Sequence, residues 1–204
     1  MTPPLPVRPR RLPADERRRA IVDAGLKVFT TGSYAGATTA EIAREAGVSE
    51  PVLYRHFASK RDLWLSCLAA AWDETRAALE AKFALYTPQA VEVESPWKSP
   101  KMPNLWIQAL TEAGEDPEIR RAVRSHMREV HDFVADAIRE AQTRGAVPAD
   151  RDANAEAWVF IAGGLLRSVA DRLGGILTSR DLEAIARQRT RWLLGTDPQE
   201  PTQG

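Results

Sequence analysis

Cysteine is nearly absent from this chain of 204 residues, since Cys67 is the single one. One thiol excludes an internal disulfide and is typical of proteins in a reducing compartment. We interpret Cys67 as a small buried apolar side chain rather than a reactive group. The sequence also lacks an apolar run of about 18 residues, and its first residues lack the apolar stretch of a signal peptide. These absences predict a cytoplasmic protein without a transmembrane helix.

Residue combinations that carry enzyme chemistry are missing as well. The three histidines, His56, His126 and His131, form no usual metal-ligand cluster with Cys67. No paired nucleophile and base and no glycine-rich phosphate loop is recognisable. The sequence therefore predicts no metal, no cofactor and no catalytic site.

Charge is balanced over the whole chain but not along it. The chain carries 28 basic and 28 acidic residues, of which residues 1–60 hold ten basic and six acidic ones. The remainder holds eighteen basic and twenty-two acidic residues. A basic front followed by an acidic remainder indicates that the front meets a polyanion.

Apolar residues recur at helical spacing along most of the chain, and no β pattern or internal repeat is present. With 44% hydrophobic residues the chain can form a core, and we predict an all-α fold of about nine helices. Gly25 lies inside the first helix, where it indicates a close approach by another helix. The longer helices are expected at residues 60–83, 104–113, 116–143 and 153–173, and from Ser179 or Asp181 to Leu194, with a loop at 85–103 and a proline-rich arm at 1–13.

Two short helices flank a tight turn in the front part of the chain. Thr38 and Glu41 have the spacing of a capping box, and Gly47 ends that helix, where a left-handed conformation suits glycine. Ser49 or Glu50 caps the next helix. Helix, glycine turn and helix is the layout of a helix-turn-helix unit, whose second helix lies in the major groove of DNA.

The second of these helices is too short and too polar on one side for a core helix. Tyr54, Arg55 and His56 are expected to face outward, toward sugar, phosphate and bases. Leu53 and Phe57 are expected to pack on the neighbouring helices. The sequence thus predicts a helix that is core on one side and contact surface on the other.

The segment "TTAEIAREAGVSEPVLYRHFASKRDL" resembles the DNA-binding signature of the tetracycline-repressor (TetR) family. The family pattern is a threonine pair, an Ile-Ala, an Ala-Gly-Val-Ser turn, a Tyr-x-His-Phe and a Lys-x-x-Leu. The chain matches this pattern at Thr38, Thr39, Ile42, Ala43, Ala46, Gly47, Val48, Ser49, Tyr54, His56, Phe57, Lys60 and Leu63. The resemblance covers about residues 17–65, and the rest agrees only in being an all-α domain of similar length.

This resemblance implies a three-helix DNA-binding domain at residues 14–62 and an all-α ligand-binding and dimerisation domain at residues 63–204. Phosphate and sugar would be contacted by Thr38, Thr39, Tyr54, His56 and Lys60, which set register but read no sequence. Bases would be read by Ala40, Glu50, Pro51, Val52 and Arg55, and Ser49 completes the expected DNA-binding set.

Two features of the front part have more than one interpretation. Glu50 could accept a hydrogen bond from a cytosine amino group, but capping of its helix is the favoured interpretation. The arm at residues 1–13, with Arg8, Arg10 and Arg11, is either a DNA-contacting arm or a solvated tail.

The last two helices are expected to form a dimer interface, because two helices from each subunit make a four-helix bundle and a dimer reads two half-sites. Alternatively, their apolar faces only close the core of one chain. The expected interface residues are Trp158, Ile161, Leu165, Leu166, Val169, Ile185 and Trp192.

The middle helices are expected to hold an effector, since pockets are mostly apolar with a few polar groups. Its candidate contacts are Trp72, Phe83, Trp106, Gln108, His126, Met127, Val130, Phe133 and Phe160. His126 fits a hydrogen-bonded core histidine better than a ligand contact. The resulting hypothesis is a dimeric repressor that binds a palindromic operator and is released by an apolar or aromatic molecule. The alternatives are an activator, or a regulator controlled by a protein partner.

Overall fold

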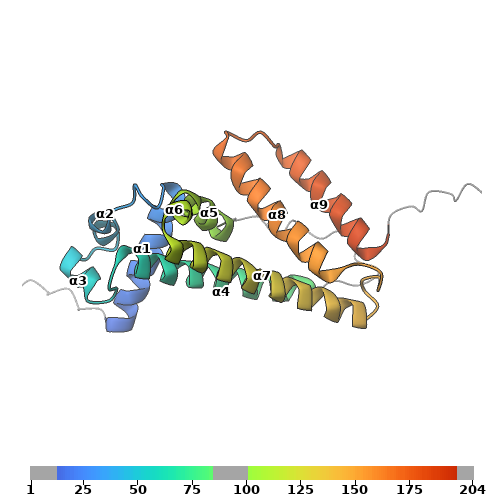
Figure 1. Ribbon diagram of the computed structural model, residues 1–204, viewed down its shortest axis with the longest axis horizontal. Helices are drawn as coiled ribbons and strands as arrows, with labels where there is room; N and C mark the ends of the chain where they lie inside the picture. Colours follow the sequence, from blue (N-terminus) through green and yellow to red (C-terminus); the bar gives the residue numbers. More distant parts are fainter. Residues whose placement is uncertain (1–12, 85–100, 197–204) are drawn as a thin grey trace, which may run out of the picture. The chain divides into compact units, whose positions relative to one another are not determined.

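The computed structural model describes residues 13–84 and 101–196. Nine α-helices and no strand lie within these ranges (Figure 1), which confirms the all-α fold. The chain divides into two compact units, Met1–Cys67 and Leu68–Gly204. The predicted boundary at residue 62 and this division both fall inside one helix, α4 (Lys60–Ala84). The arginines of the predicted arm and most of the predicted loop at 85–103 lie outside the described residues.

The first unit consists of α1 (Ala14–Thr31), α2 (Thr39–Glu45), α3 (Glu50–Tyr54) and the beginning of α4. Its core is formed by apolar side chains that are almost completely buried, namely Ile21, Phe29, Ile42, Leu53, Phe57, Leu63 and Trp64. The ring of Tyr34, from the loop after α1, stacks on Phe29 and meets the edge of Trp64. Helices as short as α2 and α3 depend on such packing, because isolated helices of this length are unstable.

Helices α1 and α4 approach each other closely at Gly25. A Cβ atom at this position would lie 2.8 Å from the sulfur of Cys67 and 3.5 Å from Leu63. The predicted close approach is therefore confirmed. Cys67 is fully buried, its thiol is 3.5 Å from the carbonyl oxygen of Val22, and burial raises the pKa of this thiol. It is a packing residue, as predicted.

The second unit contains the rest of α4 with α5 (Lys101–Gln108), α6 (Leu110–Glu115), α7 (Pro117–Thr143), α8 (Ala153–Arg172) and α9 (Ser179–Leu194). The single helix predicted at 104–113 is wrong, because the chain bends at Ala109 and forms two helices. Helix α5 also begins at Lys101, inside the predicted loop. Pro103 is tolerated there because the amides of a first helical turn need no intrahelical partner.

Capping side chains begin the three carboxyl-terminal helices. The carboxylate of Asp116 accepts from the amides of Glu118 and Ile119 at the start of α7. Asp152 does the same for α8, and Thr178 forms a capping box with Asp181 at the start of α9. The helix boundaries follow from these local signals.

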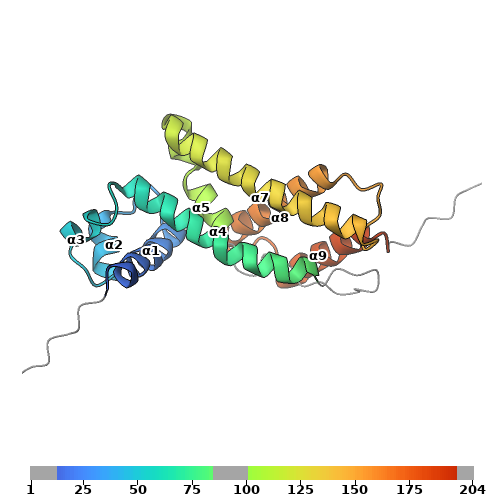
Figure 2. The same ribbon diagram turned by 90° about the horizontal axis from the view of Figure 1, so that it is seen from below.

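Helix α7 packs on α6 and α8, and α5 packs on α6 and α8. Helices α8 and α9 run side by side in opposite directions (Figures 1 and 2). The carboxylate of Glu156 joins them by accepting from the indole nitrogen of Trp192 at 3.0 Å and by pairing with Arg189. Across the described ranges, every helix is too short or too polar to span a bilayer.

Candidate nucleic-acid interface and regulatory site

Helix α3 exposes one side and buries the other. Leu53 and Phe57 are 0% and 1% exposed, which confirms them as core residues. Tyr54 is 49% exposed, Arg55 is exposed and His56 is partly exposed. The three side chains that sequence reasoning directed outward are therefore accessible on the first unit.

The turn that positions α3 depends on one glycine. Gly47 has φ +66, the left-handed conformation predicted for it. Next to it, the amide of Val48 donates to the carbonyl of Ala43 at 2.9 Å. Thr38 caps α2 by accepting from the amide of Glu41 at 3.1 Å. At the start of α3, Ser49 occupies the cap position, but its side chain makes no capping hydrogen bond.

Glu50 links α3 to α2. The hydroxyl of Thr39 donates to its carboxylate at 2.5 Å and lies 3.1 Å from the hydroxyl of Tyr54. Thr39 is 8% exposed, so its hydroxyl belongs to this contact between the helices. The favoured interpretation of Glu50 as a cap is corrected: its charge is held beside two hydroxyls that were expected to contact phosphate.

Lys60 is also engaged within the unit. Its ammonium group donates to the carbonyls of Tyr34 at 2.8 Å and Ala37 at 3.1 Å, and it lies 4.5 Å from the ring centre of Tyr34. Lys60 thus fixes the loop before α2. A phosphate that bound Lys60 would share its ammonium group with these two carbonyls. Arg18 has a comparable role, since it donates to the carbonyl of His56 at 3.2 Å and lies over the ring of Phe57.

Other polar side chains near the turn remain available for a partner. Arg55 and His56 make no side-chain hydrogen bond to any part of the chain that the structure describes, and Arg44 in the last turn of α2 is exposed in the same way. Arg44 was not among the predicted DNA contacts, although its basic side chain close to the turn could have indicated one. The two arginines, as cations without an internal partner, are suited to phosphate oxygens.

In the second unit, five of the predicted effector contacts form a row of rings with a buried histidine. Each ring centre lies between 5.3 and 6.5 Å from the next, within the range of favourable aromatic pairs. Helix α5 contributes one of these side chains, α7 two, α4 two and α8 one. Along the row their order is Trp106, His126, Trp72, Phe133, Phe83 and Phe160.

The polar side chains along this row are His126 and Gln108, and the contacts of His126 define its protonation and tautomer. The indole nitrogen of Trp106 donates to Nδ1 of His126 at 3.2 Å, and burial lowers the pKa of His126 to about 4. The imidazole is therefore neutral near pH 7 and carries its proton on Nε2. Neither this nitrogen nor the amide nitrogen of Gln108 has a partner in the described structure. Among the other candidates, Val130 is fully buried and Met127 is partly exposed.

Residues 21–67, which contain the helix-turn-helix unit, match the family model for bacterial regulatory proteins of the tetR family. This part of the chain therefore carries the DNA-binding domain of the TetR family. Its helix-turn-helix is the DNA-binding element that defines this family, and all the geometry described above for α2 and α3 falls within the matched residues.

Similar proteins agree with this assignment. The activator FasR of Mycolicibacterium smegmatis is 52% identical over 58 residues, 28% of this chain and 26% of FasR. The regulator BetI of Rhizobium meliloti is 31% identical over 113 residues, 52% of this chain and 56% of BetI. The match thus spans about a quarter and just over half of these relatives. The solved structure of regulatory protein TetR from Rhodobacter sphaeroides shares the fold, with a TM-score of 0.68 and 23% identity over 86% of this chain and 98% of that one.

Helix α8, which lies outside the residues that match the family model, is apolar on two opposite sides. Its inner side consists of small residues such as Ala157, Gly164 and Ser168, together with Ile161, which is 1% exposed. Ile161 is therefore withdrawn from the expected interface, because it belongs to the core of its own chain. The outer side carries the exposed side chains Trp158, Val159, Leu166, Val169 and Leu173, with Leu165 partly exposed beside them.

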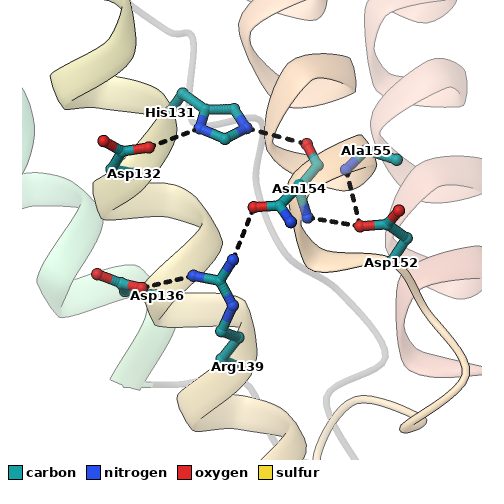
Figure 3. A network of polar contacts seen from close by, with 7 residues as sticks. All are labelled: His131, Asp132, Asp136, Arg139, Asp152, Asn154 and Ala155. Carbon is teal, nitrogen blue, oxygen red and sulfur yellow. Dashed lines mark hydrogen bonds and ion pairs between the residues drawn. The ribbon is translucent and has the colours of Figure 1, made fainter.

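A polar network behind Trp158 holds the first turns of α8 against α7 (Figure 3). His131 lies between Asp132, at 2.9 Å, and the carbonyl of Asn154, at 3.2 Å. The side chain of Asn154 accepts from Arg139 at 2.6 Å. The centre of the His131 ring lies 4.5 Å from that of Trp158, so the exposed indole packs against an imidazole that two polar contacts orient.

Proposed function

We propose that this protein is a ligand-responsive transcriptional regulator, in its simplest form a repressor that binds a palindromic operator as a dimer in the cytoplasm. The observation that carries the proposal is the accessible side of α3 and of the turn directly after it, where Tyr54 and Arg55 are exposed and His56 is partly exposed, while Leu53 and Phe57 anchor the segment in the core. Such a helix is suited to the major groove of DNA. Arg55 is the best-placed base reader, because a guanidinium binds guanine with two hydrogen bonds.

The exposed apolar sides of α8 and α9 support a dimer. A contiguous apolar surface on a regulator is best explained as an interface. On α9, Ile185 and Trp192 are 40% and 42% exposed, although both are large and apolar. We assign the interface to Trp158, Leu165, Leu166, Val169, Ile185 and Trp192, so that two helices from each subunit form a four-helix bundle.

The row of rings supports an apolar or aromatic effector. Rings from four helices offer a large contact area, and unpartnered donors on His126 and Gln108 offer hydrogen bonds to an acceptor on such a molecule. Because His126 is neutral near pH 7, the acceptor group need not be charged. We therefore place the effector among Trp72, Phe83, Trp106, Gln108, His126, Met127, Val130, Phe133 and Phe160.

Helix α4 is the natural connection between effector and DNA. It begins beside α3 with Lys60 and continues to Ala84, and it contributes Trp72 and Phe83 to the row of rings. An effector that binds better to a conformation with wrongly spaced reading heads shifts the equilibrium away from DNA by that difference in affinity.

Two variants of this function have their own support. FasR, which is 52% identical over 58 residues, is an activator. The chain could thus act as an activator through the same DNA contacts, or it could respond to a protein partner in place of a small molecule. The sign of regulation depends on where the operator lies relative to the promoter.

Selection of genomic fragments by the purified chain, followed by fluorescence anisotropy, tests the proposal. We expect the selected fragment to contain an inverted repeat and to be released by apolar or aromatic compounds. Replacing Tyr54 with alanine should weaken binding to all sequences about equally, whereas replacing Arg55 should reduce the preference for the selected fragment. Selection of no fragment would refute the function, and DNA binding insensitive to small molecules would favour the protein-controlled variant.

A further inference from the structure

Helix α7 carries three arginines on one side, and an open depression lies over this side. Arg121, Arg124 and Arg128 line this depression of about 820 Å³ together with Ser125, Glu129 and Asp132. The depression is within the size range of small-molecule sites, about 300–1,000 Å³. All six residues come from α7, and neither the DNA-binding helix nor the row of rings uses any of the three arginines.

These three arginines lack strong acidic partners, as Arg44 and Arg55 beside the turn also do. Other exposed arginines near the carboxyl end of α7 do pair with a carboxylate, as Arg139 does with Asp136 and Arg144 with Glu140, both at 2.6 Å. Arg124 and Arg128 have no acidic partner among the residues that the structure describes. Arg121 has a single long contact, 3.9 Å from the carboxylate of Glu118.

Two carboxylates also line the depression, and each is hydrogen-bonded to a side chain other than the arginines. Glu129 accepts from the indole nitrogen of Trp72 at 2.8 Å. Asp132 lies 2.9 Å from Nδ1 of His131 (Figure 3). The carboxylates keep their negative charge, so the lining carries three positive and two negative charges, with the one-charge positive excess at the arginine end.

We propose that this side of α7 binds the phosphate groups of a small soluble molecule, such as a nucleotide or another di- or triphosphate. From Arg121 to Arg128 the helix rises by about 10 Å, which is enough for more than one phosphate. Guanidinium groups bind phosphate oxygens in pairs of hydrogen bonds, and the hydroxyl of Ser125 adds another donor. The carboxylates at the other end favour a compact anion over a continuous phosphate strand such as DNA, which they would repel.

Titration calorimetry on the full chain tests this site, with inorganic pyrophosphate and ATP as probes. We expect one of them to bind, and the double variant Arg124→Gln with Arg128→Gln to weaken that binding by roughly tenfold or more. Because both side chains are exposed, these substitutions should leave the thermal unfolding midpoint unchanged. The matched control is Arg76→Gln, an exposed arginine of α4 that pairs with Glu80.

Three results would overturn the proposal. They are no binding of either probe, binding that the double variant leaves unchanged, and an equal loss in the control. The alternative is that Arg124 and Arg128 contact DNA. The affinity of the double variant for DNA, measured over a range of salt concentrations, distinguishes this alternative from a small-molecule site. If these arginines contacted DNA, the salt dependence of DNA affinity would decrease by about two phosphate contacts. An unchanged slope together with lost pyrophosphate or ATP binding supports the small-molecule site, and does so even if the protein proves to be an activator.

Discussion

At the scale of single residues, Glu50 is the unusual feature of the reading surface. Its carboxylate accepts from Thr39, beside the hydroxyl of Tyr54, where phosphate is expected to approach. Glu50→Gln keeps the shape and an acceptor for Thr39 but removes the charge. We expect DNA affinity to rise by about 1 kcal/mol, roughly fivefold, at low salt and for all sequences alike. Fluorescence anisotropy with several duplexes measures this.

The matched control for this charge effect is Glu80→Gln, on the exposed surface of α4. If Glu50 instead accepts a hydrogen bond from a cytosine amino group, the same variant would change the base preference and weaken binding to the best operator. That outcome would contradict the electrostatic role that the contact with Thr39 indicates.

A second prediction for a single residue concerns Gly25, where the effect of alanine on the free energy of unfolding should change sign between two backgrounds. Alanine is favoured over glycine in a helix by about 1 kcal/mol, but its Cβ would lie 2.8 Å from the sulfur of Cys67. Overpacking typically costs about 1–3 kcal/mol, so Gly25→Ala should lower the free energy of unfolding. In a Cys67→Ala background the space is free, and the same substitution should raise it. Urea denaturation of the four proteins measures both effects, and equal effects in both backgrounds would contradict the predicted contact.

At the scale of helices, the two caps of the helix-turn-helix differ although their residues look alike. Thr38 accepts from the amide of Glu41, whereas the side chain of Ser49 makes no capping hydrogen bond. Thr38→Ala should therefore lower the free energy of unfolding by about 1 kcal/mol, and Ser49→Ala should leave it nearly unchanged. Urea denaturation compares the two variants, and a loss on Ser49→Ala as large as that on Thr38→Ala would refute the distinction.

Most of the helical elements could be predicted from the sequence because their signals are local. Helical periodicity, caps such as Asp116 and the left-handed Gly47 act within a few residues. The break between α5 and α6 at Ala109 carries no glycine or proline, so local rules missed it. Pro103 caused the opposite error, a predicted loop where the structure has a helix. A proline in a first helical turn looks like a helix breaker in the sequence alone, so the predicted loop extended to residue 103 and the start of α5 at Lys101 was missed.

The candidate site was predicted less completely because its contacts depend on tertiary structure. Thr39 and Glu50 are 11 residues apart, and Lys60 binds a carbonyl 26 residues away at Tyr34. No local pattern reveals such pairs. Ile161 was misplaced for a related reason: α8 is apolar on both sides, and periodicity alone does not decide which side meets the chain's own core.

At the scale of the whole molecule, the proposed dimer depends on the exposed apolar side chains of α8 and α9. Leu166 is 44% exposed and lies among them. A glutamate there would bring an unpaired charge into the proposed interface, which is costly. We expect Leu166→Glu to shift the protein from dimer to monomer in analytical ultracentrifugation. Its affinity for a two-half-site operator should fall by roughly a hundredfold or more, because the two heads then bind separately.

A matched control distinguishes this effect from a general effect of surface charge. Leu110, at the start of α6, is 58% exposed and lies outside the proposed interface. Leu110→Glu should remain dimeric and bind the operator normally, since an acidic residue is also favourable in a first helical turn. If Leu166→Glu stayed dimeric while Leu110→Glu became monomeric, the interface would lie elsewhere. If both stayed dimeric with full DNA affinity, α8 would only cover its own core, and paired reading would need a different surface.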